Sequence, residues 1–341
     1  MANFDGGVNY GRNYRLEFHP LNDGESISFG QRGKLTAKDY TPGLAVDFNI
    51  TKTAPPLSLP STDKADITIY NIKPDTSRAI QRPGLFKLLL GHGSDLSLVF
   101  QGQKTTTATG IVGNDTFLNI PMVAGSYISK DRYFSNTYNR GATKVQIGND
   151  LINHIQSKFK FPVHAVIGLN EFNSKDDKVY TEPTTVRGDA LKLLAELLPN
   201  YFIFVTDSNT VNIMRRHIFN SGPLLAGPSL KWSPRYGQVD YIKYISSSSE
   251  DAETVQTGIE TRGILSPSIK VGTIMNVDTS QQRGINVADT IAAQLSPSLI
   301  QVPESFICRV TSVRHFGNTY TGDFLTEWAG DYVETDALPQ N

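Results

Sequence analysis

Cysteine is nearly missing from this sequence of 341 residues, because Cys308 is the single thiol. One thiol cannot form an internal disulfide bond, and it cannot supply the several ligands of a cysteine zinc site. The sequence therefore excludes a disulfide framework and a zinc-finger type of domain. We expect Cys308 to be a small buried apolar residue.

A charge excess of either sign is also lacking, since the net charge is −1. The balance gives no indication of nucleic-acid binding, which favours a basic surface, or of an acidic solvating tail. With 39% apolar residues, the composition is that of a globular protein with true hydrophobic cores. Its length predicts two or three domains.

Long apolar runs are missing as well. Runs such as "YFIFV", which begins at Tyr201, are far too short to span a bilayer. The first residues lack the charged-then-apolar layout of a secretion signal. We therefore expect a soluble protein without a membrane anchor, made in the cytoplasm.

Motifs for catalysis and cofactor binding are missing from the chain. It contains no GxSxG sequence and no Walker loop, and "GHGSD" at Gly91 lacks the spacing of either a nucleophile elbow or a dinucleotide site. No two of the six histidines lie four residues apart on a predicted helix. We predict no catalytic residues, no metal site and no cofactor.

Three clusters allow two interpretations each. The "KDDK" sequence at Lys175 could offer paired carboxylates but is typical of a solvated turn, and "MRRH" at Met214 is typical of a surface, with contact to an acidic partner as the alternative. Trp328 and Tyr332 are expected in a core, with a carbohydrate-binding platform as the alternative.

Alternating apolar and polar residues predict strands at both ends of the chain. Ile67 and Ile69 face one side of a predicted strand, and Leu96, Leu98 and Phe100 alternate in the same way. Frequent glycine and proline turns between such runs favour a barrel or sandwich. Strand patterns return near the C-terminus, in "SIKVGTIMNV" and "ICRVTSVRHFGNTYTGDFLTEW".

The middle of the chain has helical patterns instead. Ile147, Leu151 and Ile155 are spaced four apart and form one apolar stripe. A second helix is predicted over 186–198, and "YFIFVTDSNTVNIMRR" after it predicts a β-hairpin. These elements define a small α+β domain at 142–217.

The patterns together predict a β-rich α+β chain with two similar β-barrel domains and, between them, the small α+β domain and a connector. The predicted boundaries are 1–141 for the first barrel, 142–217 for the α+β domain, 218–254 for the connector and 255–341 for the second barrel with a loose C-terminal tail.

A long loop at 278–303 interrupts the second predicted barrel. Val287, Ile291 and Leu295 fit a short amphipathic helix within this loop. Because an apolar stripe on a long loop needs a partner, we predict that these residues form an interface with a neighbouring subunit or with another protein of the same assembly.

The segment "ITIYNIKPDTSRAI", a strand ending in "YN" before a polar turn and a short helix, resembles a segment of phage tail baseplate hub proteins. Phe86 to Gly91 and the "FQG" at Phe100 follow at similar spacings. Further on, "LLAGPSLKW", "LSPSIKVGTIMNV" and "VTSVRHFGNTYTGDFLTEW" resemble the connector, the entry strand and the closing hairpin of the second barrel in that family. The family includes the hubs of T4-type and Mu-like contractile tails and the N-terminal part of type VI secretion spike proteins, and the resemblance covers about residues 13–334.

The resemblance implies a structural protein and not an enzyme. It implies a homotrimer whose six barrels form a ring, which adapts a sixfold tail tube to a threefold spike and leaves a central channel for genome ejection. The implied partners are a tail spike protein below and tail tube or tube-initiator proteins above, with the tape measure protein as a further candidate. DNA would pass through the channel without specific binding.

The resemblance also implies a place in the virion, at the tail baseplate. Because the sequence ends shortly after the second barrel, the spike is expected to be a separate chain. Two alternatives stay open: another tail or secretion-system spike-base component with similar barrels, and a cell-wall hydrolase.

Overall fold

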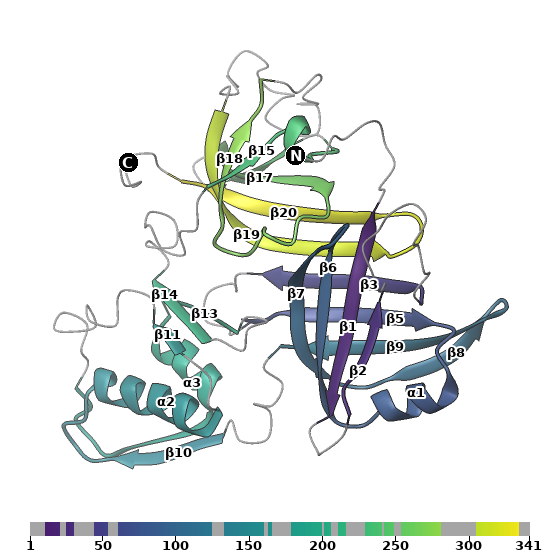
Figure 1. Cartoon of the computed structure of the whole chain (residues 1–341). Helices are drawn as coiled ribbons and strands as arrows, with labels where there is room; N and C mark the ends of the chain where they lie inside the picture. Colours follow the sequence, from purple (N-terminus) through teal and green to yellow (C-terminus); the bar gives the residue numbers. More distant parts are fainter. Residues whose placement is uncertain are drawn as a thin grey trace.

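The fold combines two β-rich modules with a small α+β unit in one chain (Figure 1). The computed structural model describes residues 11–20, 25–30, 44–53, 61–124, 133–159, 163–165, 179–199, 201–205, 211–215, 229–240, 242–248, 254–280 and 305–333. Among these residues, no helix combines the length and the apolar character needed to cross a bilayer.

The first module precedes the α+β unit. It is built from β1 (Arg12–Pro20), β2 (Ile27–Gly30), β3 (Val46–Thr53), β5 (Lys64–Tyr70), helix α1 (Pro74–Ile80), β6 (Gly84–His92), β7 (Asp95–Lys104), β8 (Ala108–Val112) and β9 (Asp115–Val123). As predicted, Ile67 and Ile69 point into its core and are fully buried.

The step from β5 to α1 depends on one asparagine. Asn71 has a left-handed φ of 55°, which turns the chain away from the sheet. Its side-chain amide donates to Asp115 Oδ1 at 2.8 Å, and its side-chain oxygen accepts from the Thr116 amide at 3.1 Å. Pro74 then begins α1, and Ile80 at the end of the helix is buried.

The second module follows the α+β unit. It is built from β15 (Leu230–Trp232), the 3-10 helix η3 (Pro234–Tyr236), β16 (Lys243–Ser248), β17 (Thr254–Ile264), β18 (Ile274–Asp278), β19 (Ser305–Asn318) and β20 (Phe324–Tyr332). The stretch predicted as a connector thus contributes β15 and β16 to the sheet.

The core of the second module contains the residues that the sequence placed there. Trp328 is 1% exposed and packs edge-on against Trp232, with the ring centroids 5.6 Å apart. Tyr332 packs against the same core, and Cys308 is fully buried. Burial raises the pKa of the Cys308 thiol to about 12. The core interpretation of these residues is confirmed.

The two modules share one strand order. The strands of the first pair in the order β1-β6-β7-β9-β5-β3, and those of the second in the order β15-β18-β19-β20-β17-β16. Taken in chain order, the six strands of one order correspond one to one with the six of the other, and β2 and β8 of the first module lie outside this comparison. All these pairs are antiparallel except β15–β18, which is parallel. The described strands form an open path from β16 to β2. The prediction of two closed β-barrels is therefore not confirmed, because no closed barrel is found in this part of the chain.

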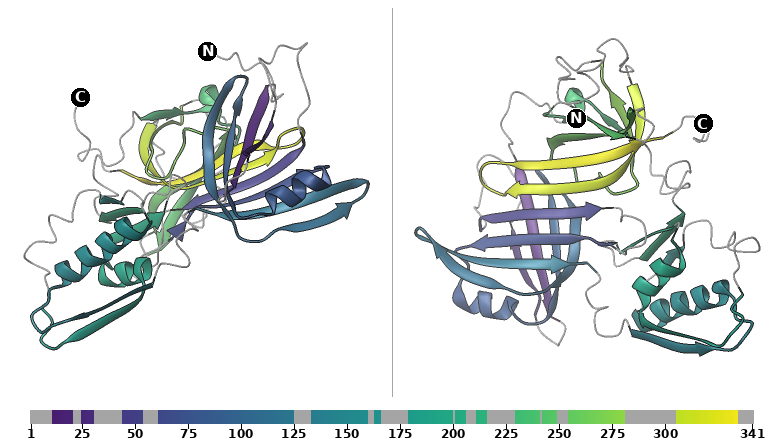
Figure 2. Two further views of the ribbon diagram at one scale, coloured as in Figure 1. Left: turned by 60° about the horizontal axis from the view of Figure 1, so that its bottom comes forward. Right: turned by 180° about the vertical axis from the view of Figure 1, so that it is seen from behind.

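The α+β unit lies beside the first module (Figure 2). It is built from β10 (Tyr133–Tyr138), α2 (Lys144–Phe159), β11 (Val163–Ala165), β12 (Thr184–Asp189), α3 (Ala190–Leu197), β13 (Tyr201–Val205) and β14 (Val211–Arg215), and the short strand β4 (Ser61–Thr62) pairs with β13. The predicted stripe of Ile147, Leu151 and Ile155 is fully buried on α2, and the predicted hairpin is β13–β14.

The predicted start of the second helix is wrong by four residues. Val186 belongs to β12, which pairs with β10, and the helix begins only at Ala190. The Asp189 carboxylate accepts from the amides of Leu191 and Lys192, both at 3.0 Å, and so caps the helix. This cap sets the start of α3, which the apolar pattern alone had placed too early.

The predicted alternation along β7 is wrong at Phe100. Leu98 pairs with Leu89 but Phe100 pairs with Leu88, so Val99 is an extra residue in a β-bulge. The bulge moves Phe100 to the buried face of the sheet, while Leu98 stays partly exposed.

Candidate assembly surface

The residues predicted to form an interface, Val287, Ile291 and Leu295, lie outside the described residues, as does the "KDDK" sequence. The backbone of Met214 lies in β14, whereas His217 is outside the described part.

The two modules are joined through their strands. β3, at one end of the first module's strand order, pairs antiparallel with β19, from Thr53 opposite Ser312 to Asp47 opposite Asn318. As a result β19, β20, β3, β5 and β9 run as one continuous sheet (Figures 1 and 2). The junction uses only the second half of β19, because β18 pairs with the first half.

Side chains at the end of the junction hold β3 against the β19–β20 turn. The Val46 amide donates to Thr319 Oγ1 at 3.0 Å, and the Thr319 amide donates to the Val46 carbonyl at 3.0 Å. The Asn318 side-chain amide donates to Asp47 Oδ1 at 2.5 Å. Asp47 Oδ2 also accepts from the Tyr70 hydroxyl at 2.6 Å, and this bond is the main cause that raises the pKa of Tyr70 to about 12.

A buried histidine lies under the junction. His315 on β19 sits between Ile50 of β3 and Thr326 of β20, with its Nδ1 atom 2.9 Å from Thr326 Oγ1. Burial, together with the charges of Lys52 and Lys270, lowers the pKa of His315 to about 3. The ring is therefore neutral at physiological pH, and it serves as a packing and hydrogen-bonding group.

One strand presents an unprotected edge. β8 pairs with β9 alone within the described ranges, and it carries neither a charged residue nor a proline. Its Ile111 and Val112 are 74% and 64% exposed, the highest values among the large apolar side chains of the described residues. Edge strands of this kind usually have charges or prolines that prevent pairing with other chains. The sequence analysis did not predict this edge, although the uncharged "ATGIV" sequence without proline is a signal that could have indicated it.

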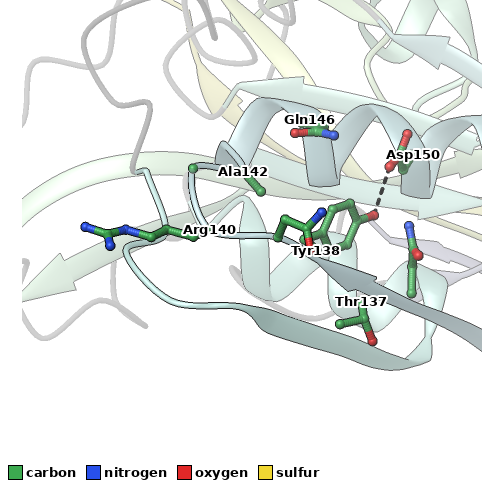
Figure 3. Close-up of a pocket in the computed structure, with 9 residues that line it drawn as sticks. Thr137, Tyr138, Arg140, Ala142, Gln146 and Asp150 are labelled. Carbon is green, nitrogen blue, oxygen red and sulfur yellow. Dashed lines mark hydrogen bonds between the residues drawn. The ribbon is translucent and has the colours of Figure 1, made fainter.

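A polar pocket of about 400 Å³ lies in the α+β unit (Figure 3). It is lined by residues 136–142 and by Gln146 and Asp150 of α2. The Tyr138 hydroxyl donates to Asp150 Oδ2 at 3.0 Å, and burial together with this bond raises the pKa of Tyr138 to about 12. The tyrosine thus keeps its proton, and the carboxylate is already engaged as an acceptor. The arrangement stabilises the contact between β10 and α2.

A smaller groove of about 200 Å³ is lined by residues of β16, β17 and β20 and by Asp240, which precedes β16. Its carboxylates are paired with cations: Asp240 Oδ2 lies 2.6 Å from Arg262 Nη2, and Glu260 Oε2 lies 3.8 Å from Lys243 Nζ. This is a solvated ion-pair network on a sheet face. In the part of the chain that the structure describes, no three acidic, histidine or cysteine side chains cluster as metal ligands would.

Comparison by sequence gives no relatives: no protein-family profile matches the chain, and no curated protein matches it. Solved structures do match over nearly the whole length. A tail protein from Neisseria meningitidis matches with a TM-score of 0.52 and 10% identity, over 96% of this chain and 98% of that one. The 43 kDa tail protein of prophage MuSo2 from Shewanella oneidensis matches with a TM-score of 0.52 and 10% identity, over 94% of this chain and 98% of that one.

This chain has the fold of phage tail proteins. The same fold extends to secretion systems, because a component of the type VI secretion system of E. coli matches with a TM-score of 0.52 and 11% identity, over 85% of this chain and 74% of that one. That component is itself described as similar to the tail proteins gp27 and gp5 of bacteriophage T4. The resemblance found in the sequence is thus confirmed as a shared fold.

Proposed function

We propose that this tail-fold protein is the structural hub of a phage tail baseplate. Three copies form a ring of six β-modules, which adapts a sixfold tail tube to a threefold spike and leaves a central channel for genome ejection. The observation that carries the proposal is the strand order repeated in the two modules of one chain, because three chains with two equivalent modules each supply six similar units.

The junction between the modules supports this role. β3 and β19 join the modules edge to edge, so the sheet continues from one module to the next instead of ending at a module boundary. A ring that uses the same kind of junction between chains has fewer exposed edges, which lowers the risk of aggregation. We also propose that the two modules are two copies of one β-barrel architecture.

The partners follow from the ring. A spike protein binds below it, tube or tube-initiator proteins bind above it, and the tape measure protein is a further candidate. DNA passes through the channel without specific contacts. A net charge of −1 suits a protein whose partners are other proteins. The proposal assigns the chain no catalytic role.

Native mass spectrometry of the purified full-length chain tests the proposal. A species of about 112 kDa, three times the 37.5 kDa of one chain, is expected at micromolar concentration. A chain that stays monomeric at every concentration would contradict it. Turnover of peptidoglycan that is lost on substitution of one carboxylate would favour the hydrolase alternative.

A second candidate function is the spike base of a secretion device. It is favoured by the type VI secretion component, which matches with the same TM-score as the phage tail proteins do. Both candidates share the ring and differ in what lies above it. Co-purification of the ring with tube proteins of a phage particle would select the hub, and co-purification with secretion-system proteins would select the spike base.

A further inference from the structure

The exposed edge of β8 is the most conspicuous unsatisfied surface in the described part of the chain. Its hairpin with β9 projects beyond the rest of the first module (Figure 1). Ile111 and Val112 are largely exposed there, and the strand offers backbone groups for pairing along its outer side. A partner strand would cover both the apolar side chains and the backbone.

The chain itself shows what an edge in this position pairs with. Lys104 of β7 pairs with Met122 of β9, and Ala108 of β8 pairs with Asn119 of β9. The step between these two pairs is one residue longer on the side of β7 and β8 than on β9, so this side contains one extra residue. The β19–β20 hairpin contains one extra residue at the corresponding place, between Val310 and Ser312. β7 and β8 together therefore correspond to β19.

The strands that pair with β7 and β8 correspond to the strands that pair with β19, with one exception. Before the extra residue, β7 pairs with β6 and β19 pairs with the equivalent strand β18. After the extra residue, β19 pairs with β3, whereas the equivalent strand β8 has no second neighbour among the described residues. The strand equivalent to β3 in the second module is β16, which ends the strand path.

We propose that β16 of one copy adds antiparallel to β8 of the next copy, in the way that β3 adds to β19 within the chain. This inference rests on the proposed ring and names the strands that close it. The path β8-β9-β5-β3-β19-β20-β17-β16 then continues from each copy into the next. The occupant is a second copy of this chain, because only the equivalent of β3 repeats the junction that already exists.

The internal repeat also gives the register. Alignment of the two hairpins at their extra residues makes Val112 equivalent to Phe316. The same alignment, carried through the β5–β9 and β17–β20 ladders, makes Ile245 equivalent to Asn49. Since Asn49 lies opposite Phe316, Ile245 of one copy is expected opposite Val112 of the next.

Cysteine cross-linking tests this register. Opposite residues on antiparallel strands have Cα atoms about 4.5–5.5 Å apart, which a disulfide can span. The double variant Val112→Cys with Ile245→Cys, treated with a mild oxidant, is expected to give covalent trimers on a denaturing gel. Each single variant should give none. Cys308 does not interfere because it is fully buried. The matched control pairs Ile245→Cys with Val179→Cys, a site that is 53% exposed on the α+β unit.

Charge on the edge provides a second test that does not depend on cross-linking geometry. The double variant Ile111→Lys with Val112→Lys should keep the melting temperature of the monomer fold, because both side chains are exposed. It should weaken trimer formation at least about tenfold, since lysines on an edge oppose strand pairing. Val179→Lys, an apolar side chain of comparable exposure, should leave the trimer unchanged.

The outcomes separate this inference from the ring. A wild-type trimer that neither cross-links at these positions nor weakens with the lysines overturns the β8–β16 pairing and leaves the hub proposal standing. A chain that is always monomeric overturns the ring and the pairing with it. Cross-linked chains that extend beyond three copies support the pairing but contradict the closed ring.

Discussion

His315 is held neutral by burial beneath the junction of the two modules. Its pKa of about 3 when folded lies below the unfolded value of about 6.5. Above pH 6.5 the ring is neutral in both states and has no effect on the pH dependence. As the pH falls from 6.5 towards 3, only the unfolded chain takes up this proton, so the folded state loses about 1.4 kcal/mol per pH unit.

Replacement of His315 by glutamine is expected to remove this part of the acid sensitivity. Between pH 7 and pH 5, the unfolding free energy of the wild type should fall by about 2 kcal/mol more than that of His315→Gln. Urea denaturation of each protein at pH 7 and at pH 5 measures how much its unfolding free energy changes with pH. An equal change of the unfolding free energy with pH in the two proteins would show that His315 is not held neutral.

Asn71 combines a left-handed backbone with two side-chain hydrogen bonds at the end of β5. Asn71→Ala keeps the unfavourable φ and loses both bonds, so it should cost about 2 kcal/mol. Asn71→Gly loses the same bonds but tolerates the φ, so it should cost about 1 kcal/mol less than alanine. Denaturant midpoints measure the two variants, and equal losses would contradict a strained backbone at this position.

At the scale of elements, the junction between modules depends on the contact of β3 with the β19–β20 turn. Thr319 is 2% exposed, and its hydroxyl accepts from the Val46 amide at 3.0 Å. Thr319→Val keeps the shape of the side chain but leaves that buried amide without its acceptor. The variant is expected to lose about 1–3 kcal/mol of unfolding free energy.

The matched control for this junction is Thr321→Val. Thr321 is exposed in the same turn, so its replacement should change stability by less than about 0.5 kcal/mol. Thermal or chemical unfolding of both variants decides the matter. Two equal and small effects would mean that the Thr319 hydroxyl does not hold the modules together.

Local signals in the sequence predicted several elements well. The alternation at Ile67 and Ile69 identified β5, and the stripe through Leu151 identified α2, because each pattern reflects burial of one face. The start of α3 was missed although Asp189, a typical N-cap, precedes the helix. The face of the sheet on which Phe100 lies was predicted wrongly, because nothing in the sequence of β7 indicates the bulge.

The assembly surface could not be predicted in the same way. Pairing of β3 with β19 joins strands more than 250 residues apart, and the choice of partner depends on the whole fold and not on local pattern. The exposure of Ile111 follows from the same long-range arrangement, because an identical sequence would be buried on an inner strand. The predicted interface at Val287, Ile291 and Leu295 stays a prediction.

At the scale of the whole molecule, the chain repeats one strand arrangement. It holds two strand sets of the same order, joined at the β3–β19 junction, and among the described residues β16 and β8, the counterparts of β3 and β19, each have one unpaired edge. A shape of this kind can assemble with further copies of itself, and rotation about one axis closes the assembly when the angle permits. The proposal is that three copies satisfy that angle.

Electron microscopy of the assembled full-length chain tests this claim most directly. Class averages of particles seen along their axis are predicted to show an annulus with a central hole, six similar lobes of density and threefold symmetry. Particles without a hole, open chains of varying length, or rings with another number of chains would contradict the account.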